Sequence, residues 1–302
     1  STISKYHQQP GSGAVVMGAE AASYGSRGDV VIGAAAEANI IRKNATVDGD
    51  GQKFSQSVAI GSVAKVYGTQ SVAIGGDVRS IGQSSIAIGG DDIDQAKPDL
   101  YKVIPDLAVP GTQKNFNREL AALYPGGLGT AGLNDSKNYV NTASIGNASL
   151  AIGMMTQSLG TGSNAIGANS LSKGVASSAI GAMARSWGNN SLAIGSQAGA
   201  YGEKSTSLGD ANTVGFDMTN ATLSGSAAGA LGRGNKVYGN NAYAIGSENT
   251  VGTATVTETT ESNGDKIKKV TAGTVKGNKA GAFGYKNTIT TDNSYVVGSN
   301  ST

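Results

Sequence analysis

Residues 189–202 read NNSLAIGSQAGAYG, and this stretch of fourteen residues decides the fold. Each half ends in glycine, and glycine recurs at every seventh position from Gly146 to Gly209. The same spacing runs from Gly61 to Gly89. A short, fixed period is typical of repeat architectures, in which each repeat packs on the next. Adjacent heptads differ in sequence, so the repeating unit has fourteen residues.

A period of seven is also the period of a coiled coil, but the composition of these heptads argues against helices. A coiled coil needs apolar residues at its a and d positions, and each glycine inside a helix costs about 1 kcal/mol. Here every heptad ends in glycine, and the apolar residues are contiguous or alternating. We therefore expect short strands joined by tight turns, with glycine adopting the positive φ of those turns.

The first strand of each unit carries alanine at its centre, as in Val58-Ala59-Ile60 and Leu192-Ala193-Ile194. Side chains alternate across a strand, so the alanine points to one side and its two neighbours point to the other. Alanine at the centre of all eight strands of this type indicates a space too narrow for a larger side chain. We therefore place the alanines inside a coil of two facing strands.

The branched neighbours of these alanines then form a long apolar face, which on an isolated chain would be an exposed patch. We expect this face to be buried against copies of the same chain. The alternative, with the bulky residues inside and the alanines outside, also fits the alternation. The predicted interface residues are Val58, Ile60, Val72, Ile74, Ile86, Ile88, Leu150, Ile152, Ile166, Ile180, Leu192, Ile194 and Ile245.

The second strand of each unit is more polar, as in Met183-Ala184-Arg185-Ser186-Trp187, and we interpret it as a half-solvated outer wall. An aromatic residue often precedes its terminal glycine. These aromatic residues are expected to stack from coil to coil: Tyr24, Tyr67, Trp187, Tyr201 and Tyr238.

The repeated motifs QSVAIG (56–61 and 70–75), SSIAIG (84–89), ASLAIG (148–153), NSLAIG (190–195) and NAYAIG (241–246) closely resemble the YadA-like head repeats of trimeric autotransporter adhesins. The resemblance implies an all-β fold, a left-handed parallel β-roll of fourteen-residue turns that assembles as a homotrimer. It also implies a non-enzymatic role in adhesion at the bacterial cell surface, in the distal part of an outer-membrane-anchored fibre. The partners that it implies are extracellular matrix proteins, host-cell receptors, other bacterial cells or abiotic surfaces.

The period divides the chain into five expected segments. Residues 1–89 hold the N-terminal head and first repeats, residues 143–252 the main repeats, and residues 280–302 the last repeats. Residues 90–142 form a long insertion, in which residues 115–124 (NFNRELAALY) are expected to form one short helix ended by Pro125. Residues 253–279 alternate around Asn263-Gly264 and predict a β-hairpin insertion. The long insertion is a candidate for contact with a partner, and a brace between subunits is the alternative.

Composition restricts the functions that the chain can have. The sequence contains no cysteine, which excludes a disulfide scaffold, and its net charge of +2 does not point to nucleic acid. It lacks the apolar stretch of about 20 residues that a membrane helix needs, so we expect no direct insertion into a membrane. The chain begins at Ser1, without an initiator methionine or a signal peptide, and has no stalk heptads or anchor. We interpret it as a fragment of a longer protein.

Candidate sites for chemistry are few. The single histidine, His7, lies in a Gln- and Gly-flanked segment, and no catalytic or cofactor-binding motif is present, so we expect neither an enzyme nor a cofactor. Asp48 and Asp50 alternate with glycine, but the spacing of a complete calcium loop is absent, and we expect no metal site. The alternative classes are a trimeric β-helix acyltransferase and an ice-binding solenoid. The coils of such an acyltransferase follow a hexapeptide repeat, whereas the repeat here is a heptad. An ice-binding solenoid needs ranks of threonine at fixed spacing, whereas threonine here clusters in residues 253–279.

Arg27-Gly28-Asp29 is the one candidate ligand-binding motif. It lies between Gly25 and Gly33, where the interval between glycines is eight residues instead of seven. The extra residue suggests a bulge that could display the tripeptide, which integrins read in other adhesive proteins.

Overall fold

The computed structural model describes residues 13–24, 28–40, 56–90, 141–215, 225–253, 255–260, 266–270 and 274–302. The described residues form strands and turns, without an α-helix among them. The chain divides into two compact units. The first comprises Ser1–Gly162 and Ile166–Asn169, and the second comprises Ser163–Ala165 and Ser170–Thr302.

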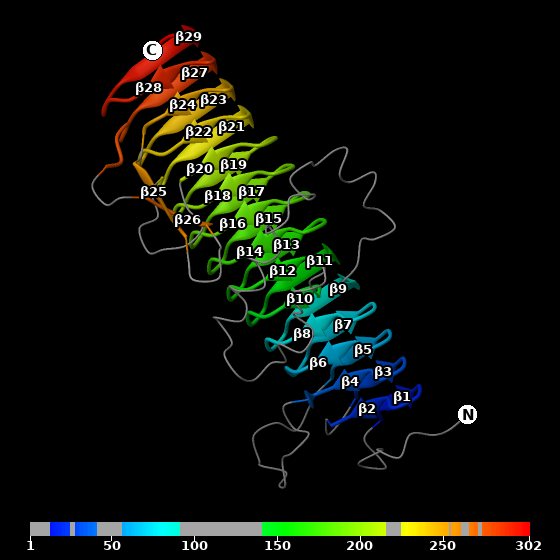
Figure 1. The fold of residues 1–302 in the computed structure, drawn as a ribbon. Coiled ribbons are helices and arrows are strands. Elements are labelled where there is room, and N and C mark those ends of the chain that lie inside the picture. Colours follow the sequence, from blue (N-terminus) through cyan, green and yellow to red (C-terminus); the bar gives the residue numbers. More distant parts are fainter. Residues whose placement is uncertain are drawn as a thin grey trace. The chain divides into compact units, whose positions relative to one another are not determined.

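The first unit is built from two parallel sheets, and the chain alternates between them (Figure 1). One sheet holds, in order, β1 (Val15–Met17), β3 (Val30–Ile32), β5 (Val58–Ile60), β7 (Val72–Ile74), β9 (Ile86–Gly90) and β11 (Leu150–Met154). The other holds β2 (Ala22–Ser23), β4 (Glu37–Ala38), β6 (Lys65–Val66), β8 (Arg79–Ser80), β10 (Ala143–Ser144) and β12 (Gln157–Ser158).

The second unit repeats this arrangement. Its first sheet holds β15 (Ser178–Ile180), β17 (Leu192–Ile194), β19 (Thr206–Leu208), β21 (Gly229–Arg233), β23 (Tyr243–Ser247), β27 (Gly281–Tyr285) and β29 (Tyr295–Ser299). Its second sheet holds β14 (Leu171–Ser172), β16 (Arg185–Ser186), β18 (Gly199–Ala200), β20 (Thr213–Val214), β22 (Lys236–Val237), β24 (Thr250–Val251) and β28 (Thr288–Ile289). The short strand β13 (Asn164–Ile166) contains residues of both units.

A separate antiparallel pair, β25 (Val256–Thr260) and β26 (Lys266–Val270), confirms the predicted hairpin, with Val256 opposite Val270. The predicted Asn-Gly turn and the predicted helix at residues 115–124 lie outside the described residues. The all-β prediction and the parallel β-roll are confirmed.

The strand register confirms the unit of fourteen residues. Val58 pairs with Val72, and Val72 pairs with Ile86. The next coil continues the same ladder across the long insertion, because Ile86 pairs directly with Leu150. Removal of residues 91–140 would leave Gly146 seven positions after Gly89. The insertion therefore enters and leaves the roll without a shift in register.

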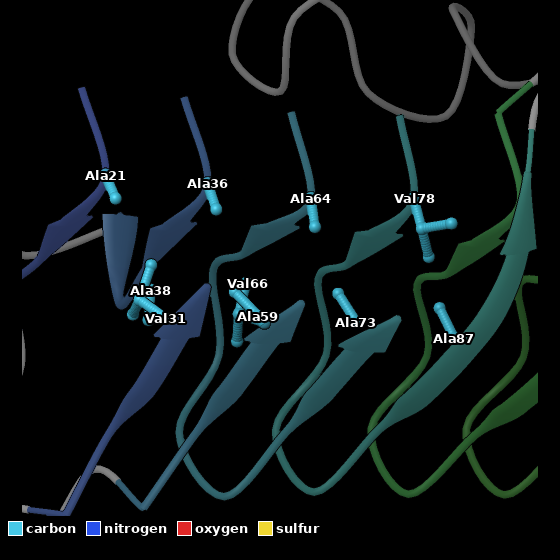
Figure 2. Close-up of a cluster of buried hydrophobic side chains, with 10 residues drawn as sticks. All are labelled: Ala21, Val31, Ala36, Ala38, Ala59, Ala64, Val66, Ala73, Val78 and Ala87. Atoms are coloured by element: carbon cyan, nitrogen blue, oxygen red, sulfur yellow. The ribbon is translucent and has the colours of Figure 1, made fainter. Parts of the chain in front are cut away.

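The interior of the roll is narrow and filled by small side chains. Ala59, Ala73 and Ala87 are fully buried in the cluster drawn in Figure 2. Because side chains alternate along a strand, the neighbours of each alanine point to the other face. Val66 of the second sheet is buried in the same cluster. In the second unit, Ala193 and Ala244 are likewise fully buried. The prediction that alanine lies inside is confirmed.

Buried serines, which the sequence analysis did not single out, complete this interior. Ser71 and Ser85 each stand two residues before the central alanine of a strand, and both are fully buried. The Ser71 hydroxyl donates to the carbonyl oxygen of Gly82 at 2.9 Å, and Ser85 Oγ lies 2.7 Å from Ser80 Oγ. These hydrogen bonds satisfy backbone groups inside coils that are too thin to exclude polar atoms.

The glycines fall into two series, and the structure requires glycine for a different reason in each. Gly61 has φ 129°, which only glycine adopts readily, as predicted. Gly68 does not have a positive φ, but a Cβ there would lie 2.2 Å from the carbonyl oxygen of Gly82 on the next coil. The prediction of a positive φ was wrong for this second series, in which glycine provides clearance. Other residues take the left-handed turn positions, among them Val63 and Gln70, both with φ 56°.

A ladder of buried asparagines runs through the second unit. Asn249 Nδ2 donates to Asn235 Oδ1 at 3.0 Å and to the Gly284 carbonyl oxygen at 2.8 Å. Its own Oδ1 accepts from the backbone N–H and the Nδ2 of Asn287, both at 3.0 Å. The amide groups thus replace apolar side chains at a position where every donor and acceptor finds a partner.

Candidate functional site

One candidate surface is the outward face of the first sheet, which we call the apolar column. In the first unit it comprises Val15, Met17, Val30, Ile32, Val58, Ile60, Val72, Ile74, Ile86, Ile88, Leu150 and Ile152. In the second unit it comprises Ser178, Ile180, Leu192, Ile194, Thr206, Leu208, Leu231, Tyr243, Ile245, Phe283, Tyr295 and Val297. None of these side chains carries a charge.

All the predicted interface residues lie on this type of face and are partly or largely exposed. Ile60 and Ile74 are half-buried, whereas Ile194 is 37% exposed and Ile245 is 42% exposed. Ile166 lies in β13, where it is also partly exposed. The alternation places them opposite the buried alanines, so strand pairing alone leaves them uncovered. Their role as an interface between copies stays a prediction.

The sequence analysis missed several members of the column because their strands depart from the Ala-Ile pattern. Met17 and Leu231, 60% and 49% exposed, belong to the sequences VVM and GAL. A signal was nevertheless present for half of the missed residues, because these directly precede a glycine of the first series. The missed residues of this type are Met17, Ile32, Leu208, Leu231, Phe283 and Val297.

The outward face of the second sheet, which we call the outer wall, has a different chemistry. In the first unit, Lys65 on β6 forms an ion pair with Glu37 on β4, with Nζ and Oε2 3.3 Å apart. Glu37 also accepts a hydrogen bond from the hydroxyl of Tyr24 at 3.1 Å. The wall is therefore polar and partly solvated there, as predicted.

Aromatic residues stack on the outer wall of the second unit. The rings of Trp187 and Tyr201, on successive coils, meet edge to face with centroids 5.9 Å apart. Lys173 places its Nζ 4.2 Å from the centre of the Trp187 ring. Burial raises the pKa of the Tyr238 phenol above 10.0. The predicted stacking is confirmed for Trp187 and Tyr201.

The Arg27-Gly28-Asp29 motif is only partly described, because Arg27 lies outside the described residues. Asp29 is fully buried and occupies the position that serine takes in later coils. Its carboxylate accepts hydrogen bonds from Ser23 Oγ at 2.6 Å, Asn39 Nδ2 at 2.9 Å and the Ser57 N–H at 2.9 Å. The display of the tripeptide stays a prediction, but the Asp29 carboxylate already has three partners within the roll. A loss of attachment in an Asp29 variant must therefore be read together with a measurement of folding.

The described residues contain no group of three or more His, Cys, Asp and Glu side chains that could hold a metal ion. They also contain no helix with the length and apolar character that crossing a bilayer requires. His7, Asp48 and Asp50 lie outside the described ranges, so the expectations about them stay predictions.

Comparison with known families identifies the repeat. The family model of the YadA head domain repeat matches residues 55–77, 172–198 and 188–212. The first match spans β5 to β7 in the first unit, and the other two span β15 to β19 in the second. Comparison with curated proteins gives no match. These matches show that the chain carries YadA head domain repeats, and together with the parallel roll, with alanine inside and glycine at each turn, they support a YadA-like head domain of a trimeric autotransporter adhesin.

Proposed function

We propose that three copies of this chain associate through the apolar column and that the assembly is an adhesive head. Adhesion in general follows from the YadA head family, whose head domains are non-enzymatic adhesin domains. The proposal places the head on the bacterial cell surface, in the distal part of a fibre anchored in the outer membrane. The observation that carries the proposal is the apolar column itself.

The energetic argument rests on what the column leaves in contact with water. Ile245 and Phe283 occupy paired positions on neighbouring strands, and they are 42% and 36% exposed. Complete burial of such a side chain contributes about 1.5–3 kcal/mol, so covering the half-exposed members contributes on the order of 1 kcal/mol each. Because the column repeats on every described coil, the sum is large enough to hold copies together against the entropy of association.

The outer wall stays available for partners in this arrangement, because it belongs to the opposite sheet. Three identical walls would offer each weak site in triplicate, and the effective concentration of the second and third sites strengthens attachment. The partners that we propose are extracellular matrix proteins, host-cell receptors, other bacterial cells or abiotic surfaces.

Association is tested with a matched pair of variants on adjacent strands. Leu231→Asp places a carboxylate in the apolar column, whereas Lys236→Asp places one on the exposed outer wall. We expect wild type and Lys236→Asp to sediment as trimers, and Leu231→Asp to dissociate or to unfold. A wild-type chain that sediments at micromolar concentration as a folded monomer would refute the proposal.

Adhesion is tested with a panel of immobilised collagen, fibronectin and laminin, cultured cells, bacteria and uncoated plastic. We expect the trimer to bind at least one member of the panel, and Lys236→Asp to form the same trimer. Leu231→Asp is expected to lose most of that binding, because single sites lack the gain from multivalency. Equal binding by the dissociated variant would contradict the multivalent mechanism, and no binding by the trimer to any member would contradict the adhesive role.

A further inference from the structure

Polar side chains interrupt one row of the apolar column in the second unit. Along this row Ser178 on β15 pairs with Leu192 on β17, and Leu192 pairs with Thr206 on β19. Asn164 holds the corresponding position on β13, which lies next to β15 in the sheet. The same row in the first unit is entirely aliphatic, with Val15, Val30, Val58, Val72, Ile86 and Leu150. Asn164 and Ser178 therefore form a polar pair on neighbouring strands of an otherwise apolar face.

Asn164 and Ser178 are hydrogen-bonded to each other, but they retain unused polar groups. Asn164 Nδ2 donates to Ser178 Oγ at 3.3 Å, and both side chains are partly exposed. An amide has two donor hydrogens and one acceptor oxygen, so Oδ1 and the second N–H of Asn164 have no partner among the described residues. The pair faces outward, because Ala165 and Ala179, next to it on each strand, are fully buried.

A uniform apolar column does not define how two copies align along it. Its branched side chains repeat on every coil, about 4.8 Å apart, so copies displaced by one coil would bury nearly the same apolar surface. A polar group that is buried against an apolar side chain loses its hydrogen bonds to water and gains none, which is costly. A polar pair at one height therefore distinguishes the aligned arrangement from displaced ones, as a single buried asparagine fixes the register of a coiled coil.

We propose that Asn164 and Ser178 form a polar layer that aligns the copies of the chain, with the same residues of the other copies as its hydrogen-bond partners. The proposal rests on the association of three copies through the apolar column. Copies related by a threefold axis present the layer at the same height, so the unused N–H of one Asn164 can donate to Oδ1 of the next. Thr206 stands apart from the layer, since Leu192 separates it from Ser178.

The test moves the layer by one coil and asks whether the shifted chain still assembles with wild type. Asn164→Leu, Ser178→Asn and Leu192→Ser together place the same polar pair on β15 and β17, where residues 178 and 192 are paired. Equal amounts of the two chains are mixed in urea and refolded, and native mass spectrometry counts the trimers. Random assembly gives about three quarters mixed trimers. We expect about tenfold fewer, because a mixed trimer buries asparagine or serine against leucine.

The matched control is Lys236→Asp on the outer wall, which should form mixed trimers with wild type at the random share. Random mixing of the shifted chain as well would overturn the proposal and would show that the layer faces solvent or a foreign partner. A wild-type chain that stays monomeric would instead refute the association through the column, and the polar layer with it. The two failures are thus distinguishable.

A second variant covers the case in which the shifted chain fails to fold. Asn164→Leu with Ser178→Leu removes the layer and introduces only the residue that Leu150 and Leu192 already provide in this row. Refolded with wild type, it is also expected to give about tenfold fewer mixed trimers than random assembly. A random share of mixed trimers would again overturn the proposal.

Discussion

Gly68 and Gly76 form a matched pair for testing the clearance that holds successive coils together. Neither glycine has a positive φ, so alanine is compatible with both backbones. At Gly76 an added Cβ meets no atom within 4 Å, whereas at Gly68 it would lie 2.2 Å from the carbonyl oxygen of Gly82. The two substitutions therefore differ almost only in the contact with the next coil.

The magnitude follows from the distance that the coils must move. Because a Cβ is essentially never found within 3.0 Å of another atom, the backbone at Gly68 must move away from the next coil by about 1 Å. The bonds from the Tyr67 N–H to Ser80 O at 2.8 Å and from the Ser84 N–H to Thr69 O at 2.9 Å flank this point. Overpacking costs about 1–3 kcal/mol and each weakened hydrogen bond about 1 kcal/mol, so Gly68→Ala should lose about 2–5 kcal/mol.

The measurement is the free energy of unfolding from urea titrations followed by far-ultraviolet circular dichroism, at one fixed chain concentration. Gly76→Ala should be neutral or stabilising by up to about 1 kcal/mol, because alanine restricts the unfolded chain. If the two variants agree to within about 0.5 kcal/mol, close approach of the coils is not what requires glycine at this position.

Three further substitutions test buried polar groups with the same titrations. Asn249→Ala should lower the free energy of unfolding by about 3–5 kcal/mol, because it removes the acceptor of buried donors on the next coil, whereas Lys236→Ala on the exposed wall should change it by less than about 1 kcal/mol. Asp29→Ala should lower the free energy of unfolding by about 3–5 kcal/mol, because three donors lose their acceptor. Asp29→Asn should lower it less, since the amide retains one acceptor oxygen. Equal stability of Asp29→Ala and wild type would contradict the structural role of the Asp29 carboxylate. Since burial raises the pKa of Tyr238 above its unfolded value of 10.0, its contribution to stability is fully present below that pH and is lost as the pH rises through the folded pKa. Tyr238→Phe should therefore weaken the alkaline loss of stability, and an identical pH profile for the two proteins would argue against burial of the phenol.

The fold could be predicted from sequence because a single local rule repeats. The Ala-Ile-Gly strands fix the phase of every coil, and the size of Ala59 and its equivalents decides which side is the interior. The same rule failed where the Ala-Ile pair is replaced, by Val16-Met17 in β1 and by Ala230-Leu231 in β21, although the glycine that follows each pair keeps the same spacing. A search for the residue that directly precedes each glycine of the first series would have found Met17 and Leu231.

Other features depend on contacts between coils that a single repeat does not reveal. Gly68 looks like any turn glycine in the sequence, and only the distance to the next coil shows that it provides clearance. The Asn249 ladder had a weak signal, since asparagine follows a glycine by three residues in several coils. No sequence signal indicated that Asp29 is buried, because the Arg-Gly-Asp tripeptide suggested only a residue displayed to a ligand.

The direct pairing of Ile86 with Leu150 bears on how such heads acquire new properties. A segment spliced between the two strands leaves the hydrogen-bonded ladder unbroken, so the register of the roll does not depend on the length of the segment. The junction after Gly90 is thus a tolerant site for grafting an epitope or an affinity tag. Each fibre tip would then carry the foreign peptide in as many copies as it has chains.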